Sequence, residues 1–461
     1  MKIKKILDKK INMDINGIKT DSRLIKKGDI FACTLGLIDK HKFINDAIKR
    51  GCKLVLTNRD ISNNIKYIKF ENLENDFKNI LDEYYHYPLE NKNLIGVTGT
   101  DGKTTIVTIL RYMLEGASIG TNGLEYFDYE EDLYNTTPSL DKLYECFNKI
   151  GKENISNIIM EVSSESYLTK RIPNLKFNIG VFTNITNEHL DKHKDFDDYF
   201  NCKMKLLENS DISVINHDSK YFKEIIKHTN NYVTYGKRNS TITLLKYKLK
   251  IDKTLIWFKY QKKKYYIESP LLGKFNVENI LACILVLLKL NYSIEEIIKR
   301  ISLIKNVKGR LELIQKNNKN ILIDYAHTIN ATKNILEFVK KYSHKKIITV
   351  VGCAGGRYKD KRKIIGKLTL KYSWKVIFTT DDPRWENACD IIKDMLNNTK
   401  KKNYYVIINR MDAIKLGYHL LDSNSILLIL GKGRDKYMAI KNKKIPYSDI
   451  DVLENIINSS C

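Results

Sequence analysis

The chain of 461 residues lacks the sequence features of secreted, zinc-binding and membrane-spanning proteins. Its eight cysteines are dispersed, with no C-x-x-C pair and no spacing typical of a zinc site. The longest apolar run, residues 280–288, is too short to cross a bilayer. The opening MKIKKILDKK carries charge but not the apolar stretch of a signal peptide. We therefore expect reduced thiols and a cytoplasmic protein without membrane insertion.

Basic residues outnumber acidic ones, and prolines are scarce. The chain has 54 Asp and Glu against 79 Lys and Arg, a formal net charge of +25, and only 6 prolines. Such a basic surplus is typical of nucleic-acid-binding proteins, but these lysines are scattered along the chain rather than concentrated in one tail. We interpret the charge as a property of composition and expect no nucleic-acid partner. A basic surface still favours the approach of a polyanionic substrate.

The hydrophobic pattern predicts an α/β protein of three domains. Residues 1–88 read as a small α/β unit with a strand from Ile30, and HYPLEN reads as a linker. Apolar strands alternate with helical patterns in residues 89–307, which predicts a mostly parallel sheet with a hairpin added at its edge in residues 241–270. In residues 308–461, three strands run into polar or Gly-rich loops: IITVVG-CAGGR, KVIFTT-DDPR and ILLILG-KGR. This predicts a Rossmann-like domain with a ligand site where those strands end.

The stretch IGVTGTDGKTTIVTIL, residues 95–110, is typical of a phosphate-binding loop although it departs from the strict G-x-x-x-x-G-K-[ST] pattern. Val97 occupies the position of the first glycine, and glycines recur at 96, 99 and 102. A strand, a glycine turn and a helix in succession aim backbone N–H groups and the helix dipole at an anion. Lys103 is placed to contact the β- and γ-phosphates, and Thr104 to bind Mg²⁺.

The form G-x-T-G-T-x-G-K-T-T resembles the Mur ligase family, the ATP-dependent amide ligases of peptidoglycan synthesis. Further segments resemble motifs of this family, most closely those of its MurE branch, which adds the third residue of the stem peptide. These segments occur in family order: DSRLIKKGDIFACTLG, TTP, MEVSSESYLTKR, VFTNITNEHLDKH, GKFNVENILA, VKGRLE, DYAHT, GCAGGRYKDKR, DDPRWEN and GKGRD. The resemblance implies ligation of an amino acid to UDP-MurNAc-L-Ala-D-Glu through an acyl phosphate, with ATP and Mg²⁺. We expect the enzyme to be a monomer.

The same resemblance implies roles for individual residues. ATP is expected to bind at Gly99, Thr100, Gly102, Lys103, Thr104, Thr105, Asn276, Asn279, Arg310 and Asp324. The expected Mg²⁺ ligands are Thr104, Glu161, His189 and, once CO₂ has carbamylated it, Lys203. The expected catalytic residues are Lys103, Glu161, His189 and Lys203. The nucleotide-dipeptide substrate is expected at Ser22, Arg23, Thr136, Thr137, Ser163 and Arg171, and the amino acid at Arg357, Asp382, Arg384, Gly431 and Asp435.

The amino-acid pocket indicates meso-diaminopimelate. Relatives that use this amino acid carry an Arg in a D-N-P-R loop, and Arg384 follows Asp381-Asp382-Pro383 here. A guanidinium binds the distal carboxylate of diaminopimelate, and lysine has no such group. Two positions depart from the motif. Asp382 stands where Asn is usual, so an extra carboxylate beside Arg384 is expected to compete with the substrate, and Asp435 replaces the usual Glu.

Other readings remain open at this point. The first group keeps the ligase chemistry: a MurE-like enzyme using L-lysine or another amino acid, a specialised paralogue, or a folylpolyglutamate-type synthetase. The D-S-R first domain argues against the folate enzyme. The second is a non-catalytic ATP-binding scaffold, against which the intact Lys103, Glu161 and Lys203 argue.

Overall fold

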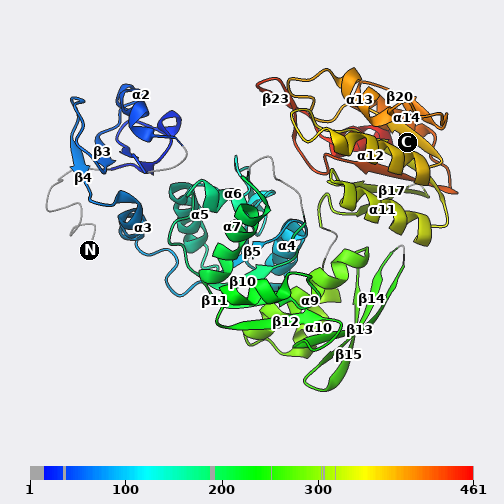
Figure 1. Cartoon of the computed structure of the whole chain (residues 1–461), viewed down its shortest axis with the longest axis horizontal. Coiled ribbons are helices and arrows are strands. Elements are labelled where there is room, and N and C mark those ends of the chain that lie inside the picture. The colour runs from blue at the N-terminus through cyan, green and yellow to red at the C-terminus, as the bar shows by residue number, and fades with distance from the viewer. Residues whose placement is uncertain are drawn as a thin grey trace. The chain divides into compact units, whose positions relative to one another are not determined.

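The computed structural model describes residues 15–34, 38–186, 193–250, 252–302, 304, 307–316 and 318–459. Within these residues the chain forms two compact units. The first comprises residues 1–244, 260–262 and 278–297, and the second comprises residues 245–259, 263–277 and 298–461. Three α/β sheets organise the two units, with a short two-stranded ribbon near the carboxyl terminus (Figure 1).

The amino-terminal sheet has four parallel strands in the order β1-β2-β3-β4. Its strands are β1 (Ile18–Lys19), β2 (Ile30–Ala32), β3 (Leu54–Thr57) and β4 (Tyr67–Lys69). The associated helices are η1 (Ser22–Leu24), η2 (Lys40–Phe43), α2 (Ile44–Lys49) and α3 (Leu73–Tyr84). The side chains of Asp21, Asp39 and Asn72 cap η1, η2 and α3 by accepting backbone hydrogen bonds, as expected for residues that precede a helix.

The central sheet has the order β15-β14-β13-β12-β11-β10-β5-β9-β6-β7-β8. Its strands are β5 (Asn93–Thr98), β6 (Ala117–Gly120), β7 (Gly123–Tyr126), β8 (Tyr129–Glu131), β9 (Asn157–Glu161), β10 (Phe177–Phe182), β11 (Ser210–Asn216), β12 (Tyr232–Gly236), β13 (Ile242–Leu249), β14 (Thr254–Tyr260) and β15 (Lys263–Ser269). Its helices are α4 (Lys103–Leu114), α5 (Leu140–Lys152), α6 (Ser164–Leu168), α7 (Phe196–Glu208), α8 (Phe222–Ile225), η3 (Ile226–His228), α9 (Lys274–Lys289) and α10 (Ile294–Ser302).

Strand β5 lies in the middle of this sheet and is parallel to both of its neighbours, β9 and β10. Its residues are almost all buried, as expected for a parallel strand covered on both faces. The loops that follow β5, β9 and β10 therefore emerge at one edge of the sheet. This shared edge positions the phosphate loop beside Glu161.

The carboxyl-terminal sheet has the order β16-β17-β21-β18-β19-β20, with only β16 antiparallel to its neighbour. Its strands are β16 (Glu312–Lys316), β17 (Lys319–Asp324), β18 (Lys346–Val351), β19 (Lys375–Phe378), β20 (Tyr404–Val406) and β21 (Ser425–Leu430). The helices are α11 (Ile329–Tyr342), α12 (Asp360–Tyr372), α13 (Ala388–Leu396), α14 (Arg410–His419) and α15 (Asp449–Ser459), and the ribbon is β22 (Tyr437–Ile440) with β23 (Lys443–Pro446).

The predicted fold class is confirmed by these sheets. The expected hairpin corresponds to β14 and β15 at one edge of the central sheet. The three loops expected to form a ligand site follow β18, β19 and β21, which are parallel neighbours, so they share one edge of the carboxyl-terminal sheet.

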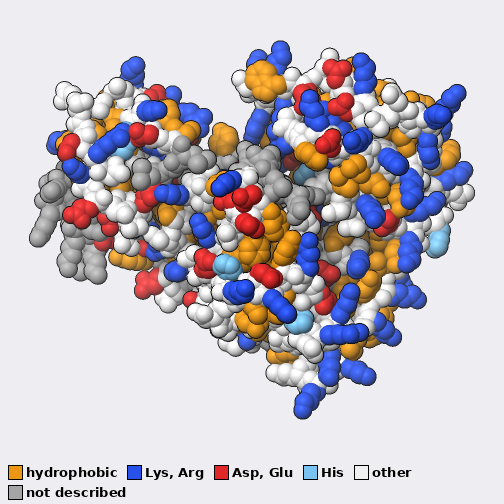
Figure 2. All heavy atoms as spheres, viewed as in Figure 1, with side chains coloured by type: hydrophobic (Ala, Val, Ile, Leu, Met, Phe, Trp, Pro, Cys, Tyr) orange, Lys and Arg blue, Asp and Glu red, His pale blue; other side chains and the backbone are white. Residues whose placement is uncertain are grey.

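Lysine and arginine side chains are spread over the visible face of the molecule rather than gathered in one patch (Figure 2). Among the described residues, no helix combines the length and apolar character needed to cross a membrane.

Candidate active site

The phosphate loop runs from Gly99 to Gly102, between β5 and α4. Gly99 has φ 143° and Gly102 has φ 88°, conformations that favour glycine. Gly96 serves packing instead, since a Cβ there would lie 2.6 Å from Leu206 Cδ1 and 2.8 Å from Phe177 Cδ1. The glycine spacing thus reflects two requirements, a turn at 99 and 102 and close packing of the strand at 96.

The segment after β10 holds this loop in place. The Thr100 N–H donates to the Asn184 carbonyl at 2.8 Å, and the Asp101 N–H donates to Asn184 Oδ1 at 3.0 Å. The Thr183 hydroxyl donates to the Asp101 carbonyl at 2.6 Å. Neither Thr183 nor Asn184 was expected to have a role, although both belong to the VFTNITNEHLDKH motif.

Two lysines contact the same loop. Lys103 Nζ donates to the Gly99 carbonyl at 2.9 Å and to the Thr100 carbonyl at 3.0 Å. Lys203, on α7, donates from Nζ to the Gly99 carbonyl at 2.7 Å and lies 4.6 Å from the centre of the Tyr199 ring. Burial lowers the pKa of Lys203 well below its ordinary value, and the nearby Lys103 lowers it further, against the opposing effect of Asp101. The hydroxyl-bearing Thr104 and Thr105 follow Lys103 in the first turn of α4 and are buried.

Glu161 ends β9 directly beside this loop, because its register partner in β5 is Val97. Its side chain is buried, and its Oε1 accepts the Thr121 N–H at 2.8 Å. The Thr137 hydroxyl donates to the Glu161 carbonyl at 2.9 Å and accepts the Ser163 N–H at 2.9 Å. Thr137 is itself fully buried, so its side chain braces the strand end that presents Glu161 and Ser163.

The residues expected to bind the nucleotide-dipeptide substrate lie in the first unit, as the phosphate loop does. Arg171 donates from Nη1 to the Thr137 carbonyl at 2.8 Å and from Nε to the Thr169 hydroxyl at 2.8 Å. Glu165 Oε2 lies 3.6 Å from Arg171 Nη2. Burial lowers the pKa of Arg171, whereas Glu165 raises it.

Three further substrate candidates differ in exposure. Thr136 Oγ1 lies 3.3 Å from Thr121 Oγ1 near the surface. In the amino-terminal sheet region Ser22 is buried, while the Arg23 side chain is exposed and pairs with the Asp21 carboxylate at 2.6 Å.

Helix α9 carries the two asparagines expected at the adenine. Asn276 is buried and donates from Nδ2 to the Leu272 carbonyl at 2.7 Å, so its amide fixes the turn that enters the helix. Asn279 Oδ1 lies 2.7 Å from the position that a Cβ on Gly102 would occupy, so Asn279 does lie at the phosphate loop.

The expected nucleotide residues of the second unit lie around the start of the carboxyl-terminal sheet. Asp324 is buried at the end of β17 and accepts the Leu311 N–H at 2.6 Å and the Ala326 N–H at 2.7 Å. The Arg310 guanidinium stacks over the Tyr325 ring at 4.8 Å. Gly431 donates its N–H to the Asp324 carbonyl at 3.0 Å, which joins the ends of β17 and β21.

The expected amino-acid pocket contains a buried cation that was not expected from the sequence, Lys432. Its Nζ lies 2.8 Å from Asp382 Oδ1, 3.5 Å from Asp435 Oδ2 and 3.9 Å from Asp381 Oδ1. Burial lowers the pKa of Lys432, but Asp381 and Asp382 outweigh this and raise it above its ordinary value. Burial raises the pKa of Asp435 to about 6, with Asp382 and Asp381 adding to the rise and Lys432 opposing it.

This arrangement changes the expectation for Asp382. Its Oδ1 accepts both Lys432 Nζ and the Ala439 N–H, the latter at 2.9 Å. The side chain of Arg384 forms no ion pair within the described part of the chain. The carboxylate that replaces the usual Asn is therefore neutralised by Lys432 rather than by Arg384.

Glu386, in the loop that carries Arg384, pairs with the buried Arg362 of α12 and bonds to the loop that carries Arg357. Glu386 receives Nη1 and Nη2 of Arg362 at 2.9 and 2.8 Å, and its Oε1 accepts the Gly356 N–H at 2.6 Å. A Cβ on Gly356 would lie 3.7 Å from Arg384 Cδ, so the two loops are in contact. Neither Arg362 nor Glu386 was selected from the sequence, although both lie within the quoted motifs.

A second buried pair holds the strand ends. Arg410 donates to both carboxylate oxygens of Asp449 at 2.8 and 2.7 Å. The same guanidinium donates to the Leu430 carbonyl at 3.0 Å and to the Thr380 carbonyl at 3.4 Å. Arg410 thereby fixes the points at which the DDPR and GKGRD loops begin.

His189, the remaining expected metal ligand, lies outside the described residues. Its neighbour His193 is buried and engaged on both ring nitrogens, with Asp198 Oδ2 at 2.9 Å and Ser164 Oγ at 2.9 Å. These contacts give His193 a structural role between α6 and α7.

Comparisons with known proteins identify the family of the chain. The chain matches the Mur ligase middle domain over residues 97–287 and the Mur ligase glutamate ligase domain over residues 309–433. It is 34% identical to the UDP-N-acetylmuramoyl-L-alanyl-D-glutamate–2,6-diaminopimelate ligase of Clostridium tetani, over 99% of each chain. It is 36% identical to the ligase of that name from Buchnera aphidicola subsp. Baizongia pistaciae, over 96% of this chain and 94% of the relative.

Solved structures show the same fold. A diaminopimelate ligase of this name superimposes with a TM-score of 0.70 at 22% identity, over 99% of both chains. The folylpolyglutamate synthase of Mycobacterium tuberculosis superimposes with a TM-score of 0.63 at 13% identity, over 77% of this chain and 91% of that chain.

Proposed function

This chain belongs to the Mur ligase family, and from that premise we propose that it uses ATP to join meso-diaminopimelate to UDP-MurNAc-L-Ala-D-Glu, a step of peptidoglycan synthesis. The observation that carries the proposal is the full-length similarity to diaminopimelate ligases, at 31–36% identity in several relatives. Similarity to the folate enzyme is limited to the fold at 13% identity.

The reaction needs activation because a carboxylate does not condense with an amine in water. In the proposed first step, an oxygen of the D-Glu carboxylate attacks the γ-phosphorus of ATP, the bond to the β–γ bridging oxygen breaks, and ADP leaves. The amine of the amino acid then attacks the acyl phosphate. The tetrahedral intermediate expels phosphate and loses a proton to give the amide. Such chemistry depends mainly on alignment and on neutralising charge.

The phosphate loop supplies that neutralisation. The free backbone N–H groups at the start of a helix such as α4 favour binding of an anion. Lys103 Nζ donates to the Gly99 and Thr100 carbonyls and so stays at the loop. We assign the triphosphate to this loop, with Gly99, Thr100, Gly102 and Thr105 around it. Asn279, near Gly102, is placed to contact the nucleotide, while Asn276 shapes the entry of the same helix. Arg310 and Asp324 are assigned to the γ-phosphate and the nucleotide.

The donor set at the strand edge fits Mg²⁺. Thr104 is a buried hydroxyl in the first turn of α4, which follows β5. Glu161 is a buried carboxylate at the end of β9, the parallel neighbour of β5. Hard oxygen donors of this kind suit Mg²⁺. Bound Mg²⁺ would neutralise charge on the phosphates. His189 is assigned as a further ligand from the family motif. We assign Lys203 as a carbamate: its amine adds to CO₂ and releases a proton, which replaces a cation by an oxygen donor.

The remaining contacts divide between two substrates. Ser22, Arg23, Thr136, Ser163 and Arg171 are assigned to the nucleotide-dipeptide, with Thr137 acting through the strand end that it braces. Arg384 is assigned to the distal carboxylate of diaminopimelate, because Asp382 is occupied by Lys432. Arg357 and Gly431 complete the pocket, and Asp435 receives an ammonium group. We place the domain limits at residues 1–88, 89–307 and 308–461 and the reaction in the cytoplasm.

A ligation assay tests the proposal. Full-length protein is supplied with ATP, Mg²⁺ and UDP-MurNAc-L-Ala-D-Glu, together with diaminopimelate, lysine or ornithine in parallel. Mass spectrometry is expected to show the tripeptide product with diaminopimelate, in much greater yield than with the other two amines. Equal use of lysine would contradict the assignment of Arg384, and absence of any product and of phosphate release would contradict the ligase assignment.

A further inference from the structure

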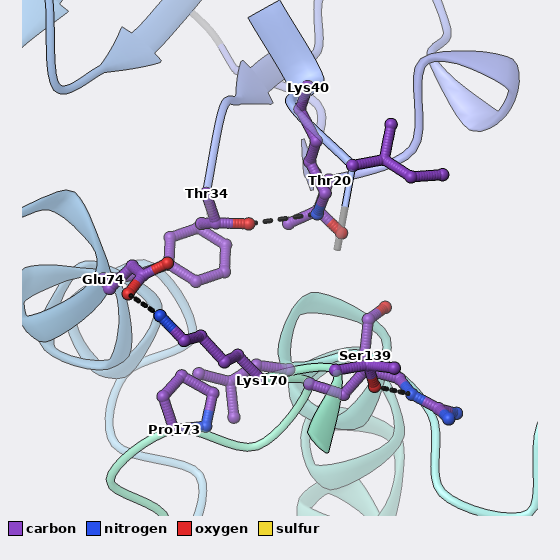
Figure 3. A pocket seen from close by; sticks show the side chains of 12 residues that line it. Thr20, Thr34, Lys40, Glu74, Ser139, Lys170 and Pro173 are labelled. Carbon is purple, nitrogen blue, oxygen red and sulfur yellow. Dashed lines mark hydrogen bonds and ion pairs between the residues drawn. The ribbon is translucent and has the colours of Figure 1, made fainter. Parts of the chain in front are cut away.

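A cavity of about 300 Å³ lies in the first unit, between the amino-terminal sheet region and the segments that flank α5 and α6 (Figure 3). This volume is at the lower end of the range for small-molecule sites. Its lining combines apolar and charged side chains. The apolar residues are Ile38, Phe77, Leu140 and Pro173, and the charged residues are Lys40, Glu74, Lys170 and Arg171.

Lys40 stands out among these residues. It projects into the cavity, and its Nζ donates to the Thr34 hydroxyl at 3.0 Å (Figure 3). It forms no ion pair within the described ranges of the chain. Burial lowers the pKa of Lys40, although Asp141, Cys33, Asp21 and Glu74 act in the opposite direction from a distance. A half-buried ammonium with one neutral partner is costly, and a bound anion relieves that cost.

The other charges of the lining also favour an anion. Lys40, Lys170 and Arg171 are three cations against one carboxylate, Glu74. Lys170 Nζ is 3.4 Å from Glu74 Oε2, on an exposed side chain where such a pair is weak. Glu74 Oε1 is buried and has no hydrogen-bond partner among the described residues, so it offers an acceptor for a ribose hydroxyl or a ring N–H.

Arg171 connects this cavity to the reaction centre. It lines the cavity and donates to the Thr137 carbonyl at 2.8 Å, and Thr137 donates to the Glu161 carbonyl. A substrate with its head group in the cavity thus has a path along Arg171 toward the phosphate loop. A nucleoside diphosphate matches a lining that combines apolar contacts, an unpaired acceptor and excess positive charge.

We propose that Lys40 is a binding residue for the diphosphate of the substrate, with Thr34 orienting its ammonium and the apolar part of the cavity receiving the nucleoside. The identity of the nucleotide, a uridine diphosphate, rests on the function proposed above. It adds a cation to the contacts at Ser22, Arg23, Ser163 and Arg171.

Calorimetric binding to the full-length protein tests this assignment, with UDP, uridine and L-Ala-D-Glu as probes. Lys40→Gln is expected to weaken UDP binding by about tenfold or more and to leave uridine binding unchanged, because a charge-assisted hydrogen bond is lost. Lys40→Arg is expected to retain most of the UDP affinity. The matched control is Lys42→Gln, an exposed lysine two residues away, which is expected to bind all three probes as the parent protein does.

Steady-state kinetics separates binding from a general structural effect. Lys40→Gln is expected to raise KM for the nucleotide-dipeptide while kcat and KM for ATP stay unchanged. Unchanged UDP affinity in the variant would overturn the proposal, as would equal losses for UDP and uridine or a loss confined to L-Ala-D-Glu. A parent protein that binds UDP no more tightly than uridine, with no salt dependence, would overturn it without any variant. UDP binding that depends on Lys40 in a protein that makes no tripeptide would instead contradict the proposed function alone.

Discussion

A buried lysine lies at the phosphate-loop edge of the central sheet, and another lies at the loop edge of the carboxyl-terminal sheet. Their surroundings shift the pKa of the two lysines in opposite directions. Lys203 contacts a neutral carbonyl and an aromatic face, and its pKa is lowered by burial and by Lys103. Lys432 is equally buried but faces three carboxylates, and its pKa is raised. Residue type and burial alone therefore do not tell which chemistry a lysine performs.

The difference follows from what surrounds each loop. The phosphate loop is held by backbone carbonyls, which accept from both of its lysines, and in the proposed function bound phosphate would balance their charge. The carboxyl-terminal loops are held by charged side chains that balance one another, with Arg362–Glu386 and Arg410–Asp449 beneath them. Lys203 is accordingly suited to react as a neutral amine, and Lys432 to remain a fixed cation.

Lys203→Met tests the central region and carries the largest expected effect. Loss of an essential ligand at the reaction centre is expected to reduce kcat for ligation on the order of 10³-fold or more. Because an apolar side chain fits a buried site without an ion pair, stability in urea is expected to change little. Lys205→Met, on the exposed face of α7, is the control for both measurements. Near-normal ligation activity of Lys203→Met would contradict the assignment of Lys203 as a carbamate ligand.

Arg410→Met tests the carboxyl-terminal region, where the main expected effect is on stability rather than on activity. Removing one partner of a buried ion pair leaves Asp449 uncompensated, and the free energy of unfolding is expected to fall by about 3–5 kcal/mol. Urea titration followed by tryptophan fluorescence measures this loss. A combined Arg410→Met and Asp449→Leu protein is expected to recover part of it. If Arg410→Met and Lys203→Met were equally stable, the contrast between the two regions would fail.

Arg384→Met tests selection of the amino acid. The kcat/KM for diaminopimelate is expected to fall about 10- to 100-fold while that for lysine changes little, because a charged hydrogen bond to the distal carboxylate is lost. Asp382→Asn serves as the matched control. Since Asp382 pairs with Lys432, this variant is expected to keep its preference for diaminopimelate. A large gain in that preference would show that Asp382 competes for Arg384.

The smallest expected effect concerns pH. In the proposed function Asp435 receives an ammonium group, which requires a deprotonated carboxylate. Its pKa is raised to about 6 by burial and by Asp382 and Asp381. KM for the amino acid is therefore expected to rise as the pH falls through about 6. Asp382→Asn removes one of the charges that raise this pKa, so the rise of KM is expected to begin at a lower pH. If the pH at which KM rises were the same in Asp382→Asn, Asp382 would not influence the titration of Asp435.

Much of the architecture is predictable from the sequence because it depends on short-range patterns. Alternating strands and helices predict the sheets, and a strand followed by G-T-D-G-K-T-T predicts the phosphate loop. The parallel order of β18, β19 and β21 brings three motif loops to one edge, as expected from their polar ends.

Other features depend on contacts that no local pattern encodes. Thr137 belongs to a motif, but its full burial appears only once Glu161 and Ser163 are packed against it. The pairing of Lys432 with Asp382 joins residues fifty positions apart. Position 96 requires glycine because a Cβ there would clash with Leu206 and Phe177, which come from other elements. The regular spacing of the glycines therefore does not show that Gly96 belongs to the phosphate-binding turn.

The fate of the substrate oxygen tests the central claim most directly. UDP-MurNAc-L-Ala-D-Glu labelled with ¹⁸O in the reacting carboxylate is incubated with the protein, ATP, Mg²⁺ and diaminopimelate, and the released phosphate is examined by mass spectrometry. Activation as an acyl phosphate predicts one ¹⁸O atom in each phosphate released with product. Phosphate free of the label would contradict an ATP-driven ligation at this site.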